Sequence, residues 1–133
     1  MLDPKDRRER GLRVYKKLGW GTNPALKELD EEFWRLTTDF VFGEIWSRPG
    51  LSLRERELVT LAALISIGTE GIDLHLRHAH KLGITNDEIK EVIFQVMYYV
   101  GQPRGLFAMK RLKGVMAEKA SSGRKKASGR KKP

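Results

Sequence analysis

The sequence predicts an all-α protein of about six helices, and three observations support this prediction. Apolar residues recur every three or four positions, and glycine and proline stop signals fall at helical intervals. No segment alternates polar and apolar residues in the manner of a strand. Capping boxes at Ser52–Glu55 and Thr85–Glu88 mark two helix starts, because the hydroxyl and carboxylate of such a box satisfy free N–H groups of the first turn.

The first part of the chain is expected to hold two helices. Asp3 is a suitable N-cap, and Pro4 follows it at the first helical position. The short amphipathic helix that begins here should end near Gly19. The pair Asn23-Pro24 repeats this arrangement and opens a longer helix to about Trp46. Its apolar residues have helical spacing: Leu26, Leu29, Phe33, Leu36 and Phe40.

Four further helices are expected after the turn at Arg48-Pro49-Gly50. The first begins at the Ser52 capping box and buries one face, formed by Leu58, Leu61, Ala62 and Ile65. The next three are expected at about 71–82, 85–100 and 103–119. Gly83 is a suitable left-handed cap for the first of these, and Gly101-Gln102-Pro103 stops the second.

The predicted helix 85–100 is apolar around most of its circumference, because Phe94, Tyr98 and Tyr99 add to its regular apolar face. A helix of this kind is usually buried on several sides. In so small a chain, a subunit interface is the natural way to provide that burial. The sequence therefore predicts an obligate oligomer.

Composition excludes several kinds of protein. There is no cysteine, which excludes disulfides, thiolate nucleophiles and cysteine-ligated metals. The charged start MLDPKDRRER lacks the apolar core of a signal peptide. The longest apolar stretch, 58–67, is too short to span a bilayer. We therefore expect a soluble cytoplasmic protein that makes no membrane contact.

Much of the net charge of +9 comes from the C-terminal segment 121–133, which holds six basic residues and no acid. Residues 1–120 are only mildly basic and have a length typical of one domain. The segment 121–133 is rich in Ser, Gly, Ala and Lys and has no apolar anchor, so we expect it to be disordered. Its binding to nucleic acid should be weak and salt-dependent.

Three histidines lie close together at His75, His78 and His80. On a helix, His75 and His78 share a face, whereas His80 points elsewhere. No third ligand with metal-site spacing accompanies them, so we expect no metal site. His75, between Leu74 and Leu76, is the better candidate for a general acid or base. The alternative is a hydrogen-bonded histidine in the core or at an interface.

Glu57 lies at the edge of the apolar stripe on its predicted helix. It is either a surface partner of Arg54 or Arg56, or a carboxylate that orients and charges His75. Spacing alone does not decide between these two interpretations.

Arg48 precedes a proline, which favours an extended backbone and places its guanidinium at a constrained turn beside Trp46. Arginine suits bidentate recognition of a carboxylate, so an anionic substrate is one interpretation. The alternative is an arginine that caps carbonyl groups of the preceding helix.

The segments FGEI, WSRPGLSLRERELVTLAAL and LHLRHAHKLGITNDEIKEVIFQVMYYVGQP together resemble the carboxymuconolactone decarboxylase family in order and spacing. The resemblance covers about residues 10–119. The related AhpD-like peroxidases carry C-x-x-C before a histidine, and those two positions fall on Gly68 and Gly71 here, which excludes a thiol peroxidase. The resemblance implies an AhpD-like helical fold, assembled as a homohexamer or trimer of dimers with sites between subunits.

The resemblance also implies an activity: cofactor-free loss of CO2 from 4-carboxymuconolactone, giving 3-oxoadipate enol-lactone in the β-ketoadipate pathway of aromatic catabolism. The implied roles are carboxylate binding for Arg48, enolate stabilisation or protonation for His75, and setting of the histidine's charge for Glu57. Trp46 and Arg77 are implied to bind the small anionic lactone. The alternatives are a same-fold isomerase or hydrolase acting on another small acid, and a non-catalytic helical oligomer that binds polyanions through its basic segment.

Overall fold

The structure, a computed structural model, describes residues 2–130, and its regular elements are all helical, which confirms the all-α prediction. It contains seven α-helices: α1 (Arg7–Leu18), α2 (Pro24–Leu29), α3 (Glu31–Leu36), α4 (Leu53–Ile67), α5 (Ile72–His78), α6 (Asn86–Val100) and α7 (Gln102–Gly129). Two short 3-10 helices, η1 (Pro4–Asp6) and η3 (Ala79–Leu82), and a π-helix, η2 (Thr37–Ile45), complete the described chain.

The described residues divide into two compact units. Unit 1 comprises the chain up to Glu57 together with His78–Ile84. Unit 2 comprises Leu58–Arg77 and the chain from Thr85 onward. The organisation of residues 1–120 as one domain stays a prediction.

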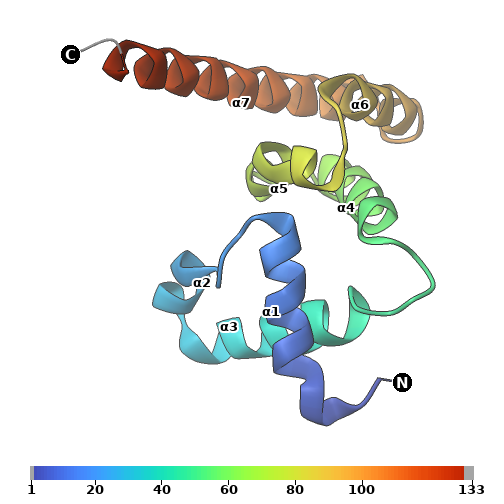
Figure 1. The fold of residues 1–133 in the computed structure, drawn as a ribbon. Coiled ribbons are helices and arrows are strands. Elements are labelled where there is room, and N and C mark those ends of the chain that lie inside the picture. Colours follow the sequence, from blue (N-terminus) through green and yellow to red (C-terminus); the bar gives the residue numbers. More distant parts are fainter. Residues whose placement is uncertain (1, 131–133) are drawn as a thin grey trace. The chain divides into compact units, whose positions relative to one another are not determined.

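In unit 1, α1 crosses η2 at two glycines (Figure 1). A Cβ atom at Gly11 would lie 2.1 Å from the carbonyl oxygen of Thr38. A Cβ atom at Gly43 would lie 2.2 Å from the carbonyl oxygen of Arg7. Both neighbours are backbone atoms, which cannot rotate away, so the crossing requires glycine on both helices.

Beside this crossing, an aromatic cluster forms the core of unit 1. The rings of Tyr15 and Phe42 are 4.7 Å apart between centroids, and those of Phe42 and Trp46 are 5.3 Å apart. Val14 and Leu18 complete the buried cluster. Aromatic pairs at such distances stabilise beyond the area they bury, so this cluster holds the end of η2 against α1.

The prediction of one helix from Pro24 to about Trp46 is wrong, because the chain breaks at Asp30. That residue is extended (φ −163°, ψ 123°), and its Oδ1 accepts a hydrogen bond of 2.7 Å from the Phe33 N–H. Asp30 therefore caps α3, a role that aspartate fills well. The apolar spacing continues across the break, which is why the sequence pattern concealed it.

The segment before the turn is a π-helix instead of the expected α-helix. The Trp46 N–H donates to the carbonyl of Val41, five residues back, at 2.9 Å, and the Ser47 hydroxyl donates to that of Phe42 at 2.7 Å. The Thr38 hydroxyl donates to the carbonyl of Trp34 at 2.7 Å. Single π turns inside helices occur often near functional sites, and this one leads directly to the turn at Arg48.

Both predicted capping boxes are present. The Ser52 N–H donates to the Glu55 carboxylate at 2.7 Å, and the Thr85 N–H donates to that of Glu88 at 2.9 Å. The helix predicted at 71–82 is instead α5 followed by η3, with Gly83 left-handed (φ 73°) as its cap.

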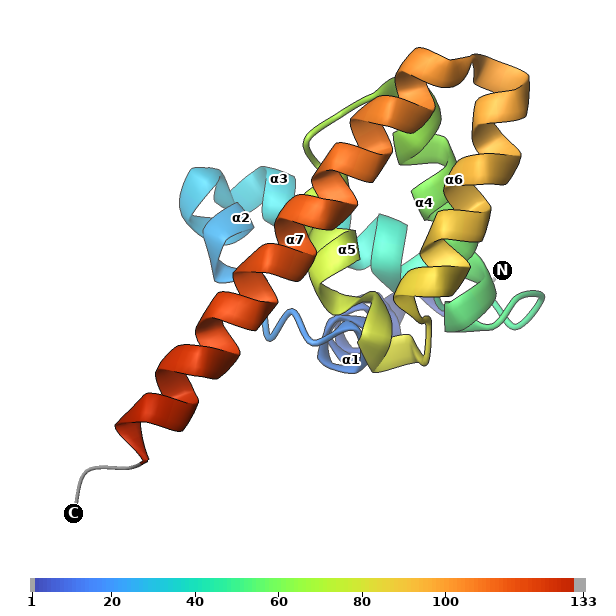
Figure 2. The same ribbon diagram turned by 90° about the horizontal axis from the view of Figure 1, so that it is seen from above.

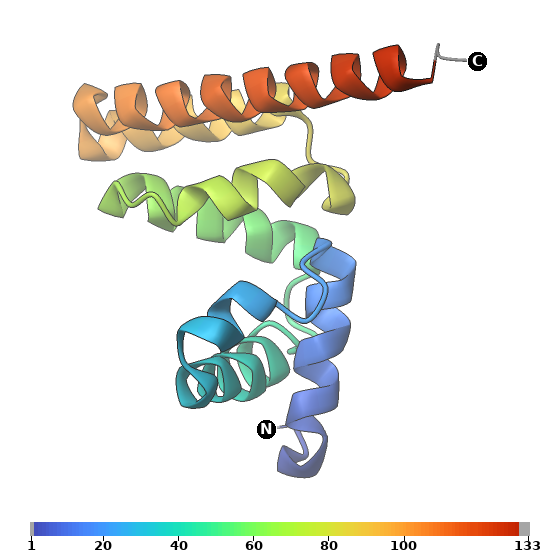
Figure 3. The same ribbon diagram turned by 90° about the vertical axis from the view of Figure 1, so that its left-hand side faces the viewer.

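In unit 2, α6 and α7 run side by side (Figure 3). Gly105 permits their close approach, since a Cβ atom there would lie 2.7 Å from Cβ of Met97. The α5 helix is tied to α7 by Asp73 and Arg111, whose two hydrogen bonds measure 2.8 and 2.5 Å. These contacts fix the position of α5, which carries His75, within unit 2.

The last helix extends beyond the predicted end at 119, because α7 continues to Gly129 through most of the segment expected to be disordered. Lysine, arginine and alanine are good helix formers, so the packed part of α7 can propagate through them. Residues 117–129 are all exposed, and this end of α7 projects beyond its packing partners in unit 2 (Figure 2). The expectation for 131–133 lies outside the described residues.

Removing residues 121–133 should leave the stability of the fold unchanged, since residues 121–130 bury nothing. We expect the unfolding midpoint to stay within about one degree and the retention on a polyanion column at low salt to fall. Calorimetry and a salt gradient measure the two effects. A drop of several degrees would show that the segment packs against another part of the protein.

The apolar surface of α6 is largely uncovered within one chain. Tyr98 is 84% exposed, Tyr99 75% and Phe94 48%. These are the residues for which the sequence predicted a subunit interface, and self-association stays a prediction. No helix among residues 2–130 is both long and apolar enough to cross a bilayer.

Candidate functional site

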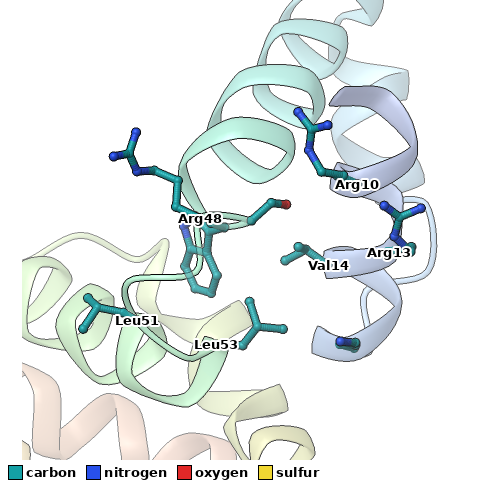
Figure 4. A pocket seen from close by; sticks show the side chains of 9 residues that line it. Arg10, Arg13, Val14, Arg48, Leu51 and Leu53 are labelled. Carbon is teal, nitrogen blue, oxygen red and sulfur yellow. The ribbon is translucent and has the colours of Figure 1, made fainter. Parts of the chain in front are cut away.

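The best-defined pocket of unit 1 lies between α1 and the turn that precedes α4, and has a volume of about 270 Å³ (Figure 4). One wall consists of side chains from α1, and the other of residues from the turn and the start of α4. The lining residues are Arg10, Arg13, Val14, Lys17, Trp46, Ser47, Arg48, Leu51 and Leu53. Four of these side chains are cationic and none is acidic, so the pocket favours an anion.

The buried Glu44 holds the base of the α1 wall in place. Nε of Arg7 lies 3.3 Å from its carboxylate and Nη2 of Arg10 lies 3.6 Å from it. Nε of Arg10 also donates to the carbonyl of Gly43 at 2.8 Å. Burial alone would raise the pKa of the Glu44 carboxyl, but the Leu2 N–H and these arginines hold it below the ordinary value.

Replacing Glu44 by Gln should lower the unfolding midpoint at pH 7, because two arginines lose their counter-charge. Since the pKa of Glu44 is lowered in the folded state, its stabilising effect is present above the ordinary value of 4.5 and is lost as the pH falls below it. The difference in unfolding midpoint between the wild type and the variant should therefore disappear at acidic pH. Thermal unfolding from pH 7 to pH 3 measures it, with the exposed Glu28→Gln as control; a constant gap would contradict the ion-pair assignment.

Arg48 and Trp46, two of the predicted site residues, meet at this pocket. Trp46 is 8% exposed and belongs to both the aromatic core and the pocket wall. The guanidinium of Arg48 is exposed, and within residues 2–130 it makes no ion pair or hydrogen bond. It points away from the α1 wall in Figure 4, so the proposed capping of helix carbonyls by this side chain is wrong. An exposed arginine changes rotamer within nanoseconds, which leaves it available to an incoming anion.

The α1 wall was missed by the sequence analysis. Arg10, Arg13 and Lys17 lie at i, i+3 and i+7, and so on one helix face. The spacing was visible in the sequence, but charges on a short amphipathic helix are ordinarily solvated. Only the packing of α1 against η2 shows that this face borders a pocket.

Glu57 is buried on α4, with 1% of its surface exposed. Glu57 is therefore not a surface carboxylate, and its pairing with Arg54 or Arg56 stays a prediction. A buried carboxylate requires a partner in the protein, and the action of Glu57 on His75 likewise stays a prediction.

His75 and Arg77 belong to unit 2. His75 is half-buried on α5. Arg77 donates to the carboxylate of Glu118 at 3.0 Å and lies 3.9 Å from that of Asp73, which raises the pKa of Arg77. Arg77 is thus held in an ion-pair network on α5 and α7, and its role in substrate binding stays a prediction. So does the meeting of Arg48, Glu57 and His75 in one site.

Comparison with known sequences identifies the family. Residues 31–114 match the sequence model of the carboxymuconolactone decarboxylase family. The chain belongs to this family. The matched segment spans parts of both units and includes all five predicted site residues.

Two named relatives are similar to the chain. The 4-carboxymuconolactone decarboxylase of Acinetobacter baylyi is 40% identical over 85 residues, which is 63% of this chain and 63% of the relative. Nitrosuccinic acid decarboxylase npaB of Metarhizium robertsii is 36% identical over 77 residues, 56% of this chain and 52% of the relative. The chain thus spans less than two thirds of the length of each relative.

Gly68 and Gly71 are the two positions at which the resemblance described above implies the C-x-x-C cysteines of AhpD-like peroxidases. Gly68 is left-handed (φ +72°), and a Cβ atom there would lie 1.9 Å from Nη1 of Arg104. A side chain at this position would be strained. The backbone at Gly68 is therefore unfavourable for any side chain, cysteine included. Among residues 2–130, no three histidine, aspartate or glutamate side chains gather as metal ligands would.

Proposed function

We propose that this protein is a cofactor-free decarboxylase that converts 4-carboxymuconolactone into 3-oxoadipate enol-lactone and CO2. The observation that carries the proposal is the 40% identity to a relative named for this activity. The basic pocket of unit 1, with the unpaired guanidinium of Arg48 beside the indole of Trp46, supports an anionic substrate.

The reaction needs no cofactor because the substrate accepts its own electrons. The bond between the ring carbon and its carboxylate breaks, and the electron pair moves through the unsaturated lactone to the carbonyl oxygen. The resulting enolate then takes one proton on carbon. Overall, a hydrogen atom replaces the ring carboxylate of the substrate, and CO2 is released. The protein must bind the anion, stabilise the enolate and supply this proton.

In the proposed mechanism, Arg48 binds a substrate carboxylate through paired hydrogen bonds. His75 stabilises the enolate or protonates it, and buried Glu57 sets the charge of that histidine. Trp46 provides an apolar wall, and Arg77 assists in binding.

The test is incubation of the purified protein with 4-carboxymuconolactone, following CO2 release and loss of the lactone. We expect turnover with equal amounts of CO2 and enol-lactone formed. Release of CO2 no faster than from buffer would overturn the proposal.

Nitrosuccinic acid is the second candidate substrate, because a relative named for its decarboxylation is 36% identical. Its nitro group can accept the electron pair as the lactone carbonyl does, so the same site chemistry would serve. Parallel assays with both acids separate the candidates: the true substrate should have the higher kcat/KM.

We further propose that the protein acts as a homo-oligomer, a hexamer or trimer of dimers, which would cover the apolar surface of α6. Sedimentation velocity tests this assignment. A monomer at micromolar concentration would contradict it.

A further inference from the structure

We infer that the basic end of α7, residues 121–130, is a docking surface for double-stranded DNA, which it contacts as a helix lying in the major groove. This segment lies after residue 114, outside the part of the chain that matches the family. The inference is independent of the proposed reaction. It rests on the exposure of the basic end, on the distribution of its charges around the helix, and on the small side chains between them.

The basic end of α7 takes no part in the packing of unit 2. Val115 is the last buried residue of α7 among those described, and Glu118 ties the helix to α5 by accepting a hydrogen bond of 3.0 Å from Arg77. Beyond these residues, α7 runs past its packing partners in unit 2 (Figure 2). A Cβ atom at Gly123 or Gly129 would meet no atom within 4 Å. The circumference of this segment is therefore open to a partner within unit 2.

Cationic side chains surround the basic end of α7. They are Arg124, Lys125, Lys126 and Arg130, and none of their charged groups forms an ion pair within residues 2–130. The sequence has no acidic residue after Glu118 that could neutralise them. Successive residues of an α-helix lie about 100° apart, so Arg124, Lys125 and Lys126 lie on three different sides of the helix. A partner that matches them must present negative charge to several sides of a rod at once.

The major groove of B-form DNA has the geometry that this charge distribution requires. It is about 12 Å wide and runs between two phosphate backbones, and it admits an α-helix, which is about 10–12 Å across with its side chains. Ser122, Ala127 and Ser128, with the two glycines, keep the helix narrow between its cations. At 1.5 Å per residue, the basic end is about 15 Å long, which is less than half a turn of the duplex. Its cations can therefore reach phosphates of both strands.

Other polyanions fit the basic end of α7 less well. A membrane surface would contact one side of the helix, and residues 121–130 hold no apolar side chain larger than alanine to enter the lipid. Single-stranded nucleic acids are commonly held by aromatic stacking, and this segment has no aromatic residue. The major groove of A-form RNA is too narrow and deep to admit a helix. Double-stranded DNA is thus the partner that the structure favours.

Binding of the full chain to labelled nucleic acids, followed by fluorescence anisotropy, tests the inference. The probes are a DNA duplex of two helical turns, one of its single strands, and an RNA duplex of the same sequence. We expect the DNA duplex to bind with a Kd of about 10⁻⁴ to 10⁻⁶ M at physiological salt, and the other two probes about tenfold more weakly. Its log affinity should fall with log salt concentration with a slope between about −3.6 and −5.4, since each of four to six neutralised phosphates contributes about −0.9.

A triple variant, with Arg124, Lys125 and Lys126 each replaced by Gln, tests whether the basic end makes these contacts. It should weaken binding to the DNA duplex about tenfold or more and reduce the salt slope by about 2.7. The segment buries nothing, so the fold should be unaffected. The matched control loses three exposed cations of unit 1 instead, by replacement with Gln of Lys5, Lys16 and Lys81. This control should reduce the salt slope by less than about 1.

Ala127→Pro tests the helix itself, because proline interrupts the helix and leaves the charge unchanged. This variant should lose most of the preference for the DNA duplex, whereas Ala127→Ser should keep it. No measurable binding to the DNA duplex, equal affinity for the DNA and RNA duplexes, or an undiminished preference in Ala127→Pro would overturn the inference. So would an equal loss in the two triple variants, or tighter binding to vesicles of phosphatidylcholine and phosphatidylserine than to the DNA duplex.

Discussion

Replacing His75 by Gln should lower kcat for 4-carboxymuconolactone by about 10² to 10⁴, the usual weight of a positioned general acid. Glutamine keeps a hydrogen-bonding side chain of similar reach but cannot donate a proton at neutral pH. The measurement is initial-rate kinetics, with circular dichroism to confirm that α5 remains folded. His80→Gln is the matched control, because His80 is exposed at the start of η3.

Glu57→Gln extends this test to the second member of the proposed site. If the buried carboxylate sets the charge of His75, the variant should lose activity and shift the pH dependence of kcat/KM. A merely structural glutamate would leave the shape of that profile unchanged.

Near-normal turnover of His75→Gln would reassign His75 as a structural histidine and remove the proton-transfer proposal.

Replacing Gly43 by Ala should destabilise the protein by about 2 kcal/mol or more, as overpacking does where a backbone must shift. The added methyl group would lie 2.2 Å from the carbonyl oxygen of Arg7. The α1–η2 crossing would have to open, and the pocket wall on α1 would move with it. Urea unfolding measures the loss.

Gly114→Ala is the control for this prediction. Gly114 lies inside α7 with no atom within 4 Å of its added Cβ, so alanine should stabilise the helix by about 1 kcal/mol. If Gly43→Ala lowers the free energy of unfolding and Gly114→Ala raises it, the effect of steric crowding is distinguished from the effect of helix propensity. If Gly43→Ala were as stable as Gly114→Ala, the close crossing of α1 and η2 would be wrong.

Local signals predicted most of the fold. The capping boxes at Ser52 and Thr85 and the left-handed caps at Gly19 and Gly83 lie at helix ends in the structure. The sequence did not reveal the break at Asp30, because the apolar residues keep their helical spacing on both sides of this N-cap. The end of α7 was missed because composition does not distinguish a disordered basic segment from the propagated end of a packed helix.

The sequence predicted those site residues that have a distinctive local setting, such as a constrained turn or a charged side chain within an apolar stripe. Arg48, at a constrained turn, lines a pocket, and Glu57, at the edge of the apolar stripe, is buried. Lys17 could not be selected from the sequence, because nothing in its neighbourhood sets it apart from Lys16. It is distinguished only by the three-dimensional packing of α1.

The π-helix of residues 37–45 constrains how this protein can change in length. An α-helix turns about 100° per residue, and η2 accommodates its residues in wider turns whose hydrogen bonds reach five positions back. Deleting one residue here would let the segment revert to α-helical geometry with about the same total rotation, so Trp46 would keep its place in the aromatic cluster. Inserting one residue would add rotation that the already widened turns cannot absorb, and Trp46 would leave the cluster. Insertions in homologous chains should therefore be rarer than single deletions in this stretch, even where substitutions are frequent.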